Sequence, residues 1–308
     1  MKKRQAVCGA AFFLANVATG TAQTDPGLST KPAGVTLSGE RLAPEKAPVD
    51  LSRPEPEAMD FFATEEEKEF LRAAADGQVW AQARLGIIYV NTPDDTARME
   101  LGRGMLEHAA SQDSPDALFE LAKMALAGRG MVRSPSEAFD YMRRAAELGL
   151  PEAQYELASM YANGQGASQD SEQALKWARQ AATQGQPHAM HSVSVTLLRR
   201  AVNQQEIAQG LGLLEKAAAQ NHRESEMILA GILTRGEFGM PKDEAKAESL
   251  LLPRAEAGDA EFQFGLASLY LYGRLFGEKR EAGRKWLQQS AEGGYKSAVE
   301  LLSNPEEN

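Results

Sequence analysis

A period of about 36 residues runs through most of this 308-residue chain. It is marked by glycine, or by Asp or Asn in its place, and the markers stand at Gly77, Asp113, Gly149, Gly185, Asn221, Gly258 and Gly294. One step, before Gly258, is longer by one residue. A regular period of roughly 20–50 residues is typical of solenoids, in which each repeat packs only on its neighbours. The repeat therefore constrains the fold more than any other feature of the sequence.

Three columns of the repeat have restricted residue types. The fourth residue after the marker is usually small: Ala81, Ala117, Ala153, Ala189, Ser225, Phe262 and Ala298. The eighth is large and apolar: Leu85, Leu121, Leu157, Val193, Leu229, Leu266 and Leu302. A pair such as Ala145-Ala146 stands four and three residues before the marker. Small residues let two helices approach at the short end of the roughly 8–10 Å interaxial range.

Each repeat is expected to form two antiparallel helices. In the third repeat, apolar residues recur at helical spacing at Ala153, Leu157, Met160 and Tyr161. Gly164-Gln165-Gly166 then ends the first helix, because glycine readily takes the left-handed conformation found at helix C-termini. Asp170 is predicted to cap the second helix, as Ser134 does in the preceding repeat. Stacked pairs of this kind predict an all-α solenoid.

The full pattern resembles the Sel-one-like repeat (SLR), a short relative of the tetratricopeptide repeat. The residues that carry it are Ala153, Tyr155, Leu157, Ala158, Tyr161, Gly164, Gly166, Asp170, Ala174, Trp177, Ala181, Ala182 and Gly185. The match covers about 73–302 and is strongest in the second, third and sixth repeats. The resemblance implies a right-handed α/α superhelical solenoid of about six helix pairs with terminal capping helices, and binding of another protein.

The first 22 residues have the pattern of a cleaved signal peptide. A basic segment, Lys2-Lys3-Arg4, precedes an apolar run over 6–15 and the small residues Gly20-Thr21-Ala22. The run is shorter than the roughly 20 residues that a membrane-spanning helix needs. We therefore expect export to the periplasm or secretion, with a mature chain that does not span the membrane.

The remaining boundaries follow from composition. Residues 23–60 are rich in Pro, Ser, Thr and Gly and are expected to form a disordered leader. A capping helix is predicted over 61–76, opened by Thr64 with Glu67 at capping-box spacing. The repeat solenoid follows over 77–302, and 303–308 form a polar tail.

Charge and cysteine content exclude several classes of function. Cleavage removes three basic residues from 33, so the mature chain carries 30 Lys and Arg against 43 Asp and Glu, a net charge of −13. Such an acidic chain is not expected to bind nucleic acid. The single Cys8 is lost with the signal peptide, which leaves neither disulfides nor thiolate chemistry.

No motif in the repeats predicts catalysis or a cofactor. The Gly-Gln-Gly loop follows no strand, so helix termination explains it better than phosphate binding. His188 and His191 share a helix face but lack a third ligand at metal-binding spacing. His191 stands in an apolar column and is expected to line the core, while His108 and His222 are isolated in sequence. We predict no metal site, no cofactor and no enzyme.

What remains is the variable face of the first helices, which lines the groove of repeat solenoids. It combines positions three, seven, ten and fourteen after each marker. The residues predicted to bind a partner are Trp80, Arg84, Glu120, Lys123, Glu156, His188, Arg199, Arg200, Arg235 and Tyr272. Ordinary solvent exposure is the alternative for many of them. Aromatic and arginine side chains dominate interface energies, which favours Trp80, Tyr272 and the arginines.

The sequence thus favours a repeat scaffold that binds another protein in the cell envelope, as a regulator or in assembly. A glycan or peptidoglycan-fragment binder is the alternative, favoured if Trp80 and Tyr272 line closed pockets. A hydrolase has the least support, because no nucleophile motif appears.

Overall fold

The computed structural model describes residues 65–92, 95–273 and 279–303. The chain divides into two compact units, Met1–Pro48 and Val49–Asn308. The first unit lies outside the described residues, and so do the predicted signal peptide, the leader and the predicted cap at Thr64. The final helix, Lys296–Ser303, includes the first residue of the predicted polar tail, and 304–308 lie outside the described residues.

All regular structure in these described segments is α-helical, which confirms the predicted all-α solenoid. The helices are α1 (Glu65–Ala75), α2 (Val79–Val90), α3 (Thr96–Ser111), α4 (Pro115–Ala127), α5 (Pro135–Glu147), α6 (Pro151–Asn163), α7 (Ser171–Thr183), α8 (Pro187–Arg200), α9 (Gln204–Ala219), α10 (Arg223–Arg235), α11 (Glu244–Glu256), α12 (Ala260–Tyr272), α13 (Arg280–Glu292) and α14 (Lys296–Ser303).

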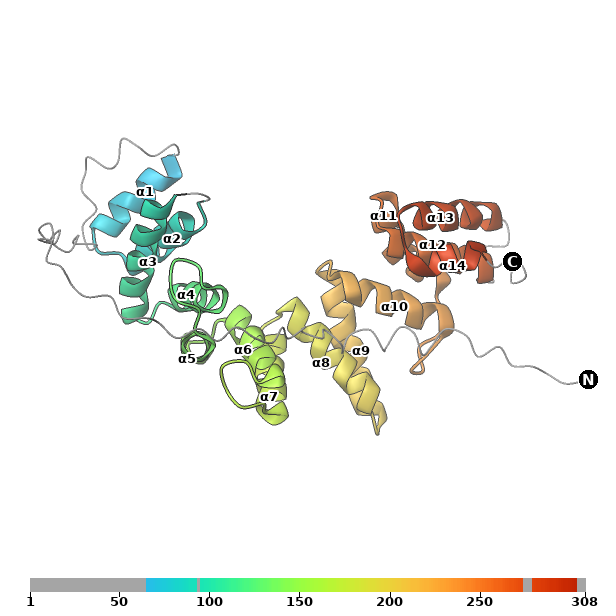
Figure 1. The fold of residues 1–308 in the computed structure, drawn as a ribbon. Helices are drawn as coiled ribbons and strands as arrows, with labels where there is room; N and C mark the ends of the chain where they lie inside the picture. Colours follow the sequence, from blue (N-terminus) through green and yellow to red (C-terminus); the bar gives the residue numbers. More distant parts are fainter. Residues whose placement is uncertain (1–64, 93–94, 274–278, 304–308) are drawn as a thin grey trace, which may run out of the picture. The chain divides into compact units, whose positions relative to one another are not determined.

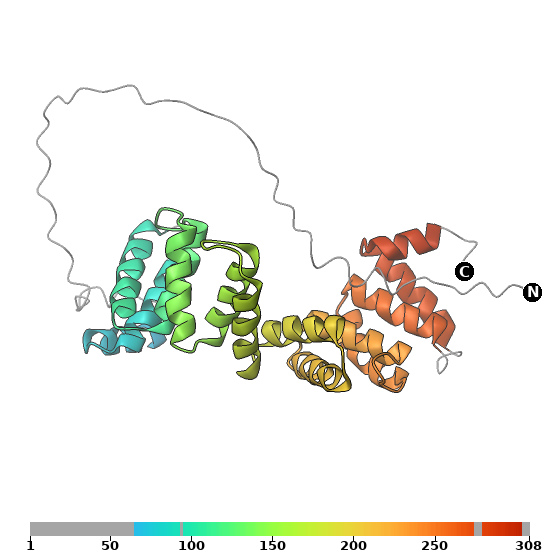
Figure 2. The same cartoon turned by 90° about the horizontal axis from the view of Figure 1, so that it is seen from below.

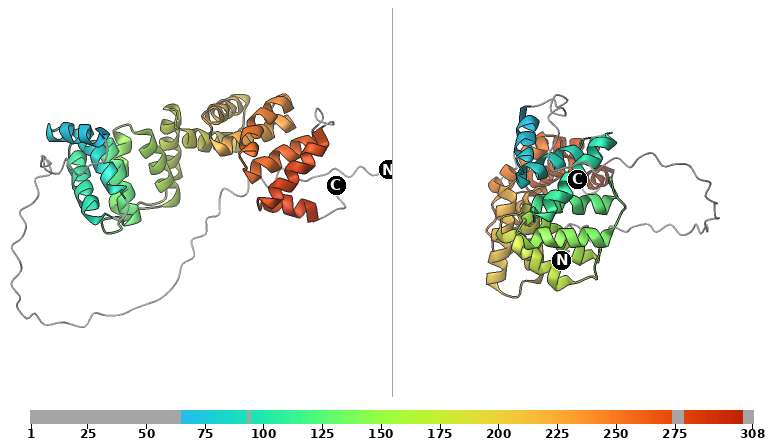
Figure 3. Two further views of the ribbon diagram at one scale, coloured as in Figure 1. Left: turned by 90° about the horizontal axis from the view of Figure 1, so that it is seen from above. Right: turned by 90° about the vertical axis from the view of Figure 1, so that its left-hand side faces the viewer.

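The six repeats correspond to the pairs from α2–α3 to α12–α13, with α1 before them and α14 after them. Within each pair the two helices pack closely, and each pair packs on the next in chain order (Figure 1, Figure 2). The extensive helix–helix contacts of the described residues join neighbours or next-but-one helices along the chain, as further views also illustrate (Figure 3). Each repeat therefore depends on its sequence neighbours for its core.

The alanine pair and the marker of each repeat form one C-terminal motif. All seven markers have positive φ, from 56° at Asp113 to 97° at Gly149. The Gly149 amide donates to the Ala146 carbonyl at 3.0 Å, and the Leu150 amide donates to the Ala145 carbonyl at 3.2 Å. This is the Schellman pattern, which satisfies carbonyls at a helix end. The same two bonds recur at the other six markers.

The core follows the predicted columns with one exception. The fourth residue after each marker is fully buried in all seven cases, and so are the eighth residues from Leu85 to Leu266. Leu302 is the exception, since it is 43% exposed. Its neighbour Leu301 packs on the final core cluster instead. The apolar column therefore shifts by one residue in α14.

The predicted helix ends are confirmed in the second and third repeats. The side chain of Ser134 accepts from the Glu137 amide, and that of Asp170 accepts from the Glu172 and Gln173 amides. Gly128 and Gly164 take the left-handed conformation at the ends of α4 and α6. A search of the described residues for helices long and apolar enough to cross a membrane finds none.

Candidate interaction face

The ten residues predicted to bind a partner lie on six first helices. Trp80 and Arg84 are on α2, and Tyr272 is the last residue of α12. The others occupy helices between these two, namely Glu120 and Lys123 on α4, Glu156 on α6, His188, Arg199 and Arg200 on α8, and Arg235 on α10. Nine of them occupy positions three, seven, ten or fourteen after a marker and Arg200 follows Arg199 directly, but their environments differ.

The structure brings the middle of the predicted set together. The Glu156 carboxyl has a raised pKa, chiefly because surrounding protein desolvates it, while its side chain still reaches solvent. The charge of Lys123, and that of His188 when it is protonated, act in the opposite direction on the same carboxyl. Side chains from α4 and α8 therefore lie within electrostatic reach of Glu156 on α6.

Glu120 corrects the expectation of an exposed face at this position. Its side chain is buried, and its carboxylate pairs with Lys123 at 2.7 Å and with Arg129 at 2.8 Å. A buried carboxylate needs such partners, because its desolvation is otherwise unfavourable. Glu120 thus holds the loop that follows α4, and Lys123 carries the exposed part of this ion pair.

The two aromatic residues at the ends of the set remain accessible. Trp80 is 52% exposed, and its indole contacts the Phe70 ring edge-on at a centroid distance of 6.0 Å. The indole N–H donates to Gln78 Oε1 at 3.1 Å. Tyr272 is 64% exposed. Both rings therefore offer apolar surface to a partner, and α1 supports one of them.

Of the three arginines predicted to form a basic surface, one is paired with a carboxylate. Arg199 and Arg200 end α8 and are exposed. Arg235 instead binds Glu237 with two hydrogen bonds, from Nε at 2.6 Å and from Nη2 at 3.2 Å. Because the Glu237 carboxylate compensates its charge, Arg235 contributes less to a basic surface than the sequence indicated.

A cluster of three histidines is the main feature that sequence reasoning missed. His188 Nδ1 lies 3.0 Å from His222 Nε2, and the rings of His191 and His222 have centroids 4.8 Å apart. Ser225 Oγ lies 3.0 Å from both His191 Nδ1 and His222 Nδ1. Tyr155 of α6 stacks on His188 at 5.6 Å. The available signal was the spacing of about one repeat between His188 and His222.

This cluster revises two expectations. His191 is half-buried and its ring forms a hydrogen bond with Ser225, so it does more than replace an apolar core residue. His222, isolated in sequence, is buried and caps α10 by accepting from the Ser225 amide. Burial lowers the pKa of His191 to about 4, helped by the neighbouring histidines and opposed by Glu224. Burial also lowers the pKa of His222.

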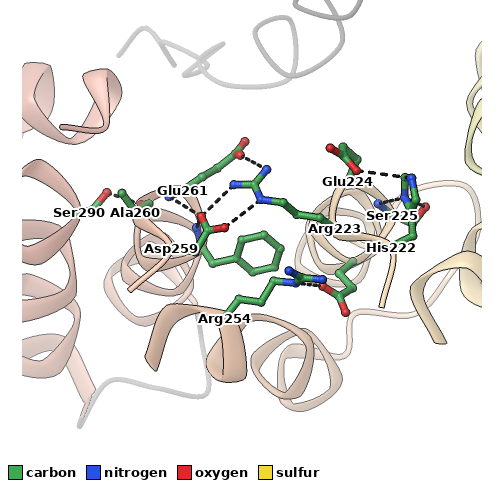
Figure 4. Close-up of polar contacts among 11 residues, drawn as sticks. His222, Arg223, Glu224, Ser225, Arg254, Asp259, Ala260, Glu261 and Ser290 are labelled. Atoms are coloured by element: carbon green, nitrogen blue, oxygen red, sulfur yellow. Dashed lines mark hydrogen bonds and ion pairs between the residues drawn. The ribbon is translucent and has the colours of Figure 1, made fainter. Parts of the chain in front are cut away.

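Polar contacts continue from α10 to α12 (Figure 4). Arg223 donates from Nε and Nη2 to the two carboxylate oxygens of Asp259, each at 2.8 Å, and pairs with Glu261 at 2.8 Å. Arg223 and Arg254 both lie over the Phe262 ring, at 5.3 and 5.5 Å from its centroid. Adjacent first helices are thus joined by charged groups at this end of the face.

Among the described residues, the serine hydroxyl that contacts two histidines is closed to solvent. Ser225 has two histidine partners but is fully buried, so a substrate has no access to its hydroxyl. Within the described segments, no group of three or more His, Cys, Asp or Glu is placed to hold a metal ion. A surface hollow of about 400 Å³ lies among α5, α6 and α7 and is lined by Trp177, Gln154, Gln180 and Gln184. Neither Trp80 nor Tyr272 lines it.

Fold and face together define an α-helical repeat protein whose exposed first helices offer charged and aromatic groups. Five segments of the sequence match the Sel1 repeat model: 115–150, 151–186, 197–222, 224–259 and 260–295. They cover more than half of the chain, which therefore belongs to the Sel1 repeat family. The match omits the first helix pair and covers only part of the fourth, two of the repeats in which the pattern is weakest.

Two solved structures support this assignment. The chain is 25% identical to a Sel1 repeat protein from Oxalobacter formigenes, with a TM-score of 0.61 over 72% of this chain and 86% of the other. It is 27% identical to c5321, a protective antigen of uropathogenic Escherichia coli with an SLR fold, with a TM-score of 0.61. That alignment covers 75% of this chain and 50% of the other. No curated protein matches the sequence.

Proposed function

We propose that this chain is an exported adaptor that binds another protein in the cell envelope, in a regulatory or assembly role. Sel1 repeat proteins generally act as protein-interaction scaffolds. The observation that carries the proposal is that Lys123 of α4 and His188 of α8 both lie within electrostatic reach of Glu156 on α6, so that one face joins three consecutive first helices. A partner segment lying along these helices can contact several repeats at once, which adds binding energy without a deep pocket.

Export rests on the N-terminal pattern of basic, apolar and small residues over 1–22. N-terminal sequencing of the protein from fractionated cells tests this directly. A mature N-terminus near Gln23, found outside the cytoplasm, is expected. An intact N-terminus in the cytoplasm would contradict export and leave the adaptor proposal to be tested separately.

Affinity capture tests the interaction face with a matched control. Arg84→Glu with Arg199→Glu changes two exposed arginines of first helices, on α2 and α8. Arg179→Glu with Arg284→Glu makes the same charge change on the second helices α7 and α13. We expect a protein from the envelope fraction to be retained by the parent and by the second-helix variant, and lost by the first-helix variant. Equal capture by both variants would contradict the proposed face.

Glycan binding is the second candidate. The hollow lined by Trp177 is a better site for it than the surroundings of Trp80 or Tyr272, which do not line the hollow. An aromatic face beside side-chain amides is suited to a polar ligand with apolar patches. The Gln184 amide donates to Gln154 Oε1 at 2.8 Å, and the Gln154 amide donates to the Ala146 carbonyl at 3.2 Å. Calorimetry with peptidoglycan fragments at two temperatures tests it. Binding by the parent that is weakened in Gln180→Ala would support glycan binding, and no binding heat at either temperature would contradict it.

A further inference from the structure

The contact between the fourth and fifth repeats uses ionisable side chains where other repeats use mainly apolar ones. Six residues after the marker, four other repeats carry Phe119, Tyr155, Met227 and Phe264. The fourth repeat has His191 at this position, and its Nδ1 contacts Ser225 Oγ on α10. This joint between α8 and α10 therefore depends on hydrogen bonds that a proton can disrupt.

Hydrogen bonding determines which nitrogens of the cluster are protonated. The Ser225 amide can only donate, so His222 Nδ1 must accept from it at 3.3 Å. The proton of a neutral His222 then lies on Nε2, which donates to His188 Nδ1 at 3.0 Å. His188 Nδ1 is consequently also unprotonated. The observed bonds of both rings require them to be neutral.

Adding a proton to either ring breaks a specific bond. A proton on His222 Nδ1 would face the Ser225 amide and remove the N-terminal cap of α10. A proton on His188 Nδ1 would face the N–H of His222. His191 lies against His222, with ring centroids 4.8 Å apart, so a charge on one disfavours a charge on the other. The cluster is satisfied in its neutral form.

Charged groups from the neighbouring helices act in both directions. Glu224 of α10 lies 3.5 Å from His222 Nε2 and favours protonation. Arg254 of α11 disfavours it at His222. On α6, Tyr155 stacks on His188, and a proton on that ring would interact favourably with the Glu156 carboxylate. Burial decides the balance at the two inner rings, because it lowers the pKa of both His191 and His222.

We propose that His188, His191 and His222 form a proton-sensitive joint, which holds the fourth and fifth repeats together at neutral pH and weakens in acid. The joint is independent of the adaptor function. Its sign follows from linkage: an opened joint binds protons more readily than the closed one, so closure weakens as the pH falls below about 6.5. For His191, with a pKa of about 4 when closed and 6.5 when opened, the opening equilibrium rises about 30-fold between pH 7.5 and pH 5.

Hydrogen–deuterium exchange of the whole mature chain at pH 7.5 and 5 tests the joint, after correction for intrinsic exchange rates. We expect protection in α8 and α10 to fall at least tenfold more than in α4, which contains no histidine. His191→Met supplies the residue found at the equivalent position of the next repeat. His222→Asn keeps a residue type that caps helices well. The double variant should lose the extra pH response, whereas His108→Gln on α3 should retain it.

An equal loss of protection in all repeats of the parent would overturn the proposal, as would an unchanged response in the folded double variant. If the double variant does not fold, nuclear magnetic resonance of the parent still decides. The imidazole signals of His191 and His222, assigned with the single variants or by sequential methods, should titrate below pH 6.5. Titration of both rings at or above pH 6.5 would contradict the joint.

Discussion

Arg223 and Asp259 form a two-bond ion pair that joins α10 to the N-terminus of α12, with both N–O distances at 2.8 Å. Asp259 is at the same time the N-cap of α12, because it accepts from the Glu261 and Phe262 amides. One carboxylate thus links two repeats and begins a helix. Burial raises the pKa of Asp259, but the bonds from Arg223 and from the amides outweigh it, so the pKa lies below its usual value.

The two roles of Asp259 can be separated by substitution. Asp259→Asn retains a good cap and removes the charge, so the free energy of unfolding should fall by only about 0.5–1 kcal/mol for this partly exposed pair. Asp259→Ala also removes the cap and should lose about 1 kcal/mol more. Urea unfolding at pH 7 measures both. Equal losses would show that the cap contributes nothing.

The depressed pKa of Asp259 also predicts a dependence on pH. The stability contributed by its ionised form is present above pH 3.8 and is lost as the pH falls below that value toward the lower pKa of the folded state. The difference in unfolding free energy between the parent and Asp259→Asn should therefore shrink between pH 5 and pH 3. A constant difference over this range would contradict the assigned ion pair.

The same substitution at two positions of one repeat column should change the free energy of unfolding by very different amounts. Leu157 is fully buried, and Leu157→Ala should lower the free energy of unfolding by about 2–5 kcal/mol. Leu302 is 43% exposed, and Leu302→Ala should change it by less than about 0.5 kcal/mol. Thermal and urea unfolding of both variants measure this. A large loss at Leu302 would restore the unbroken frame that the sequence suggested.

Two glycines inside helices should also respond differently to alanine. A Cβ at Gly102 would lie 2.7 Å from Tyr89 Cβ and 2.9 Å from the Gly86 carbonyl oxygen, so α2 and α3 would have to separate. Gly102→Ala should lower stability by about 1–3 kcal/mol. Gly212 has no such neighbours within 4 Å, and Gly212→Ala should raise stability by about 0.4–1 kcal/mol. Differential scanning calorimetry would show the opposite shifts, and a shift of the same sign would contradict the close α2–α3 packing.

The glycines of the Gly164-Gln165-Gly166 loop have different roles. At Gly164 an added Cβ meets no atom closer than 3.4 Å, so Gly164→Ala should lose only the roughly 1–2 kcal/mol of left-handed strain. At Gly166 the Cβ would lie 2.1 Å from the Pro135 carbonyl oxygen of α5. Gly166→Ala should therefore lose about 3 kcal/mol or more. Similar losses for the two variants, measured by urea unfolding, would argue against this close contact.

The repeat in the sequence predicted the helix ends and the core correctly wherever a position has the same structural environment in every repeat. Markers, alanine pairs and apolar columns recur because each repeat must end its helices and bury one face in the same way. The last part of the chain departs from the frame, since Leu301 packs on the final core cluster and Leu302 is 43% exposed. Periodicity alone does not show that the apolar column shifts by one residue in α14.

The candidate face was predicted less well, because position in a repeat does not determine what lies opposite. Glu120 occupies a position expected to be exposed, yet Lys123 and Arg129 enclose it. His222 is isolated in sequence, yet it lies between His188 and Ser225. The Glu120 contacts depend on the path of the loop that follows α4. The His188–His222 contact joins consecutive repeats, so it depends on how far one helix pair is rotated and shifted against the next.

The sequence by itself determined the helical class, the period, the helix ends and most of the core, because these follow from local backbone preferences and from the spacing of apolar residues. Only the tertiary structure decided which polar side chains meet, such as the three histidines across α8 and α10 or Arg223 and Asp259 across α10 and α12. The physical reason is that hydrogen bonds and ion pairs require atoms to lie within about 3 Å in a defined orientation. Apolar burial tolerates looser geometry and can be recognised from the pattern alone.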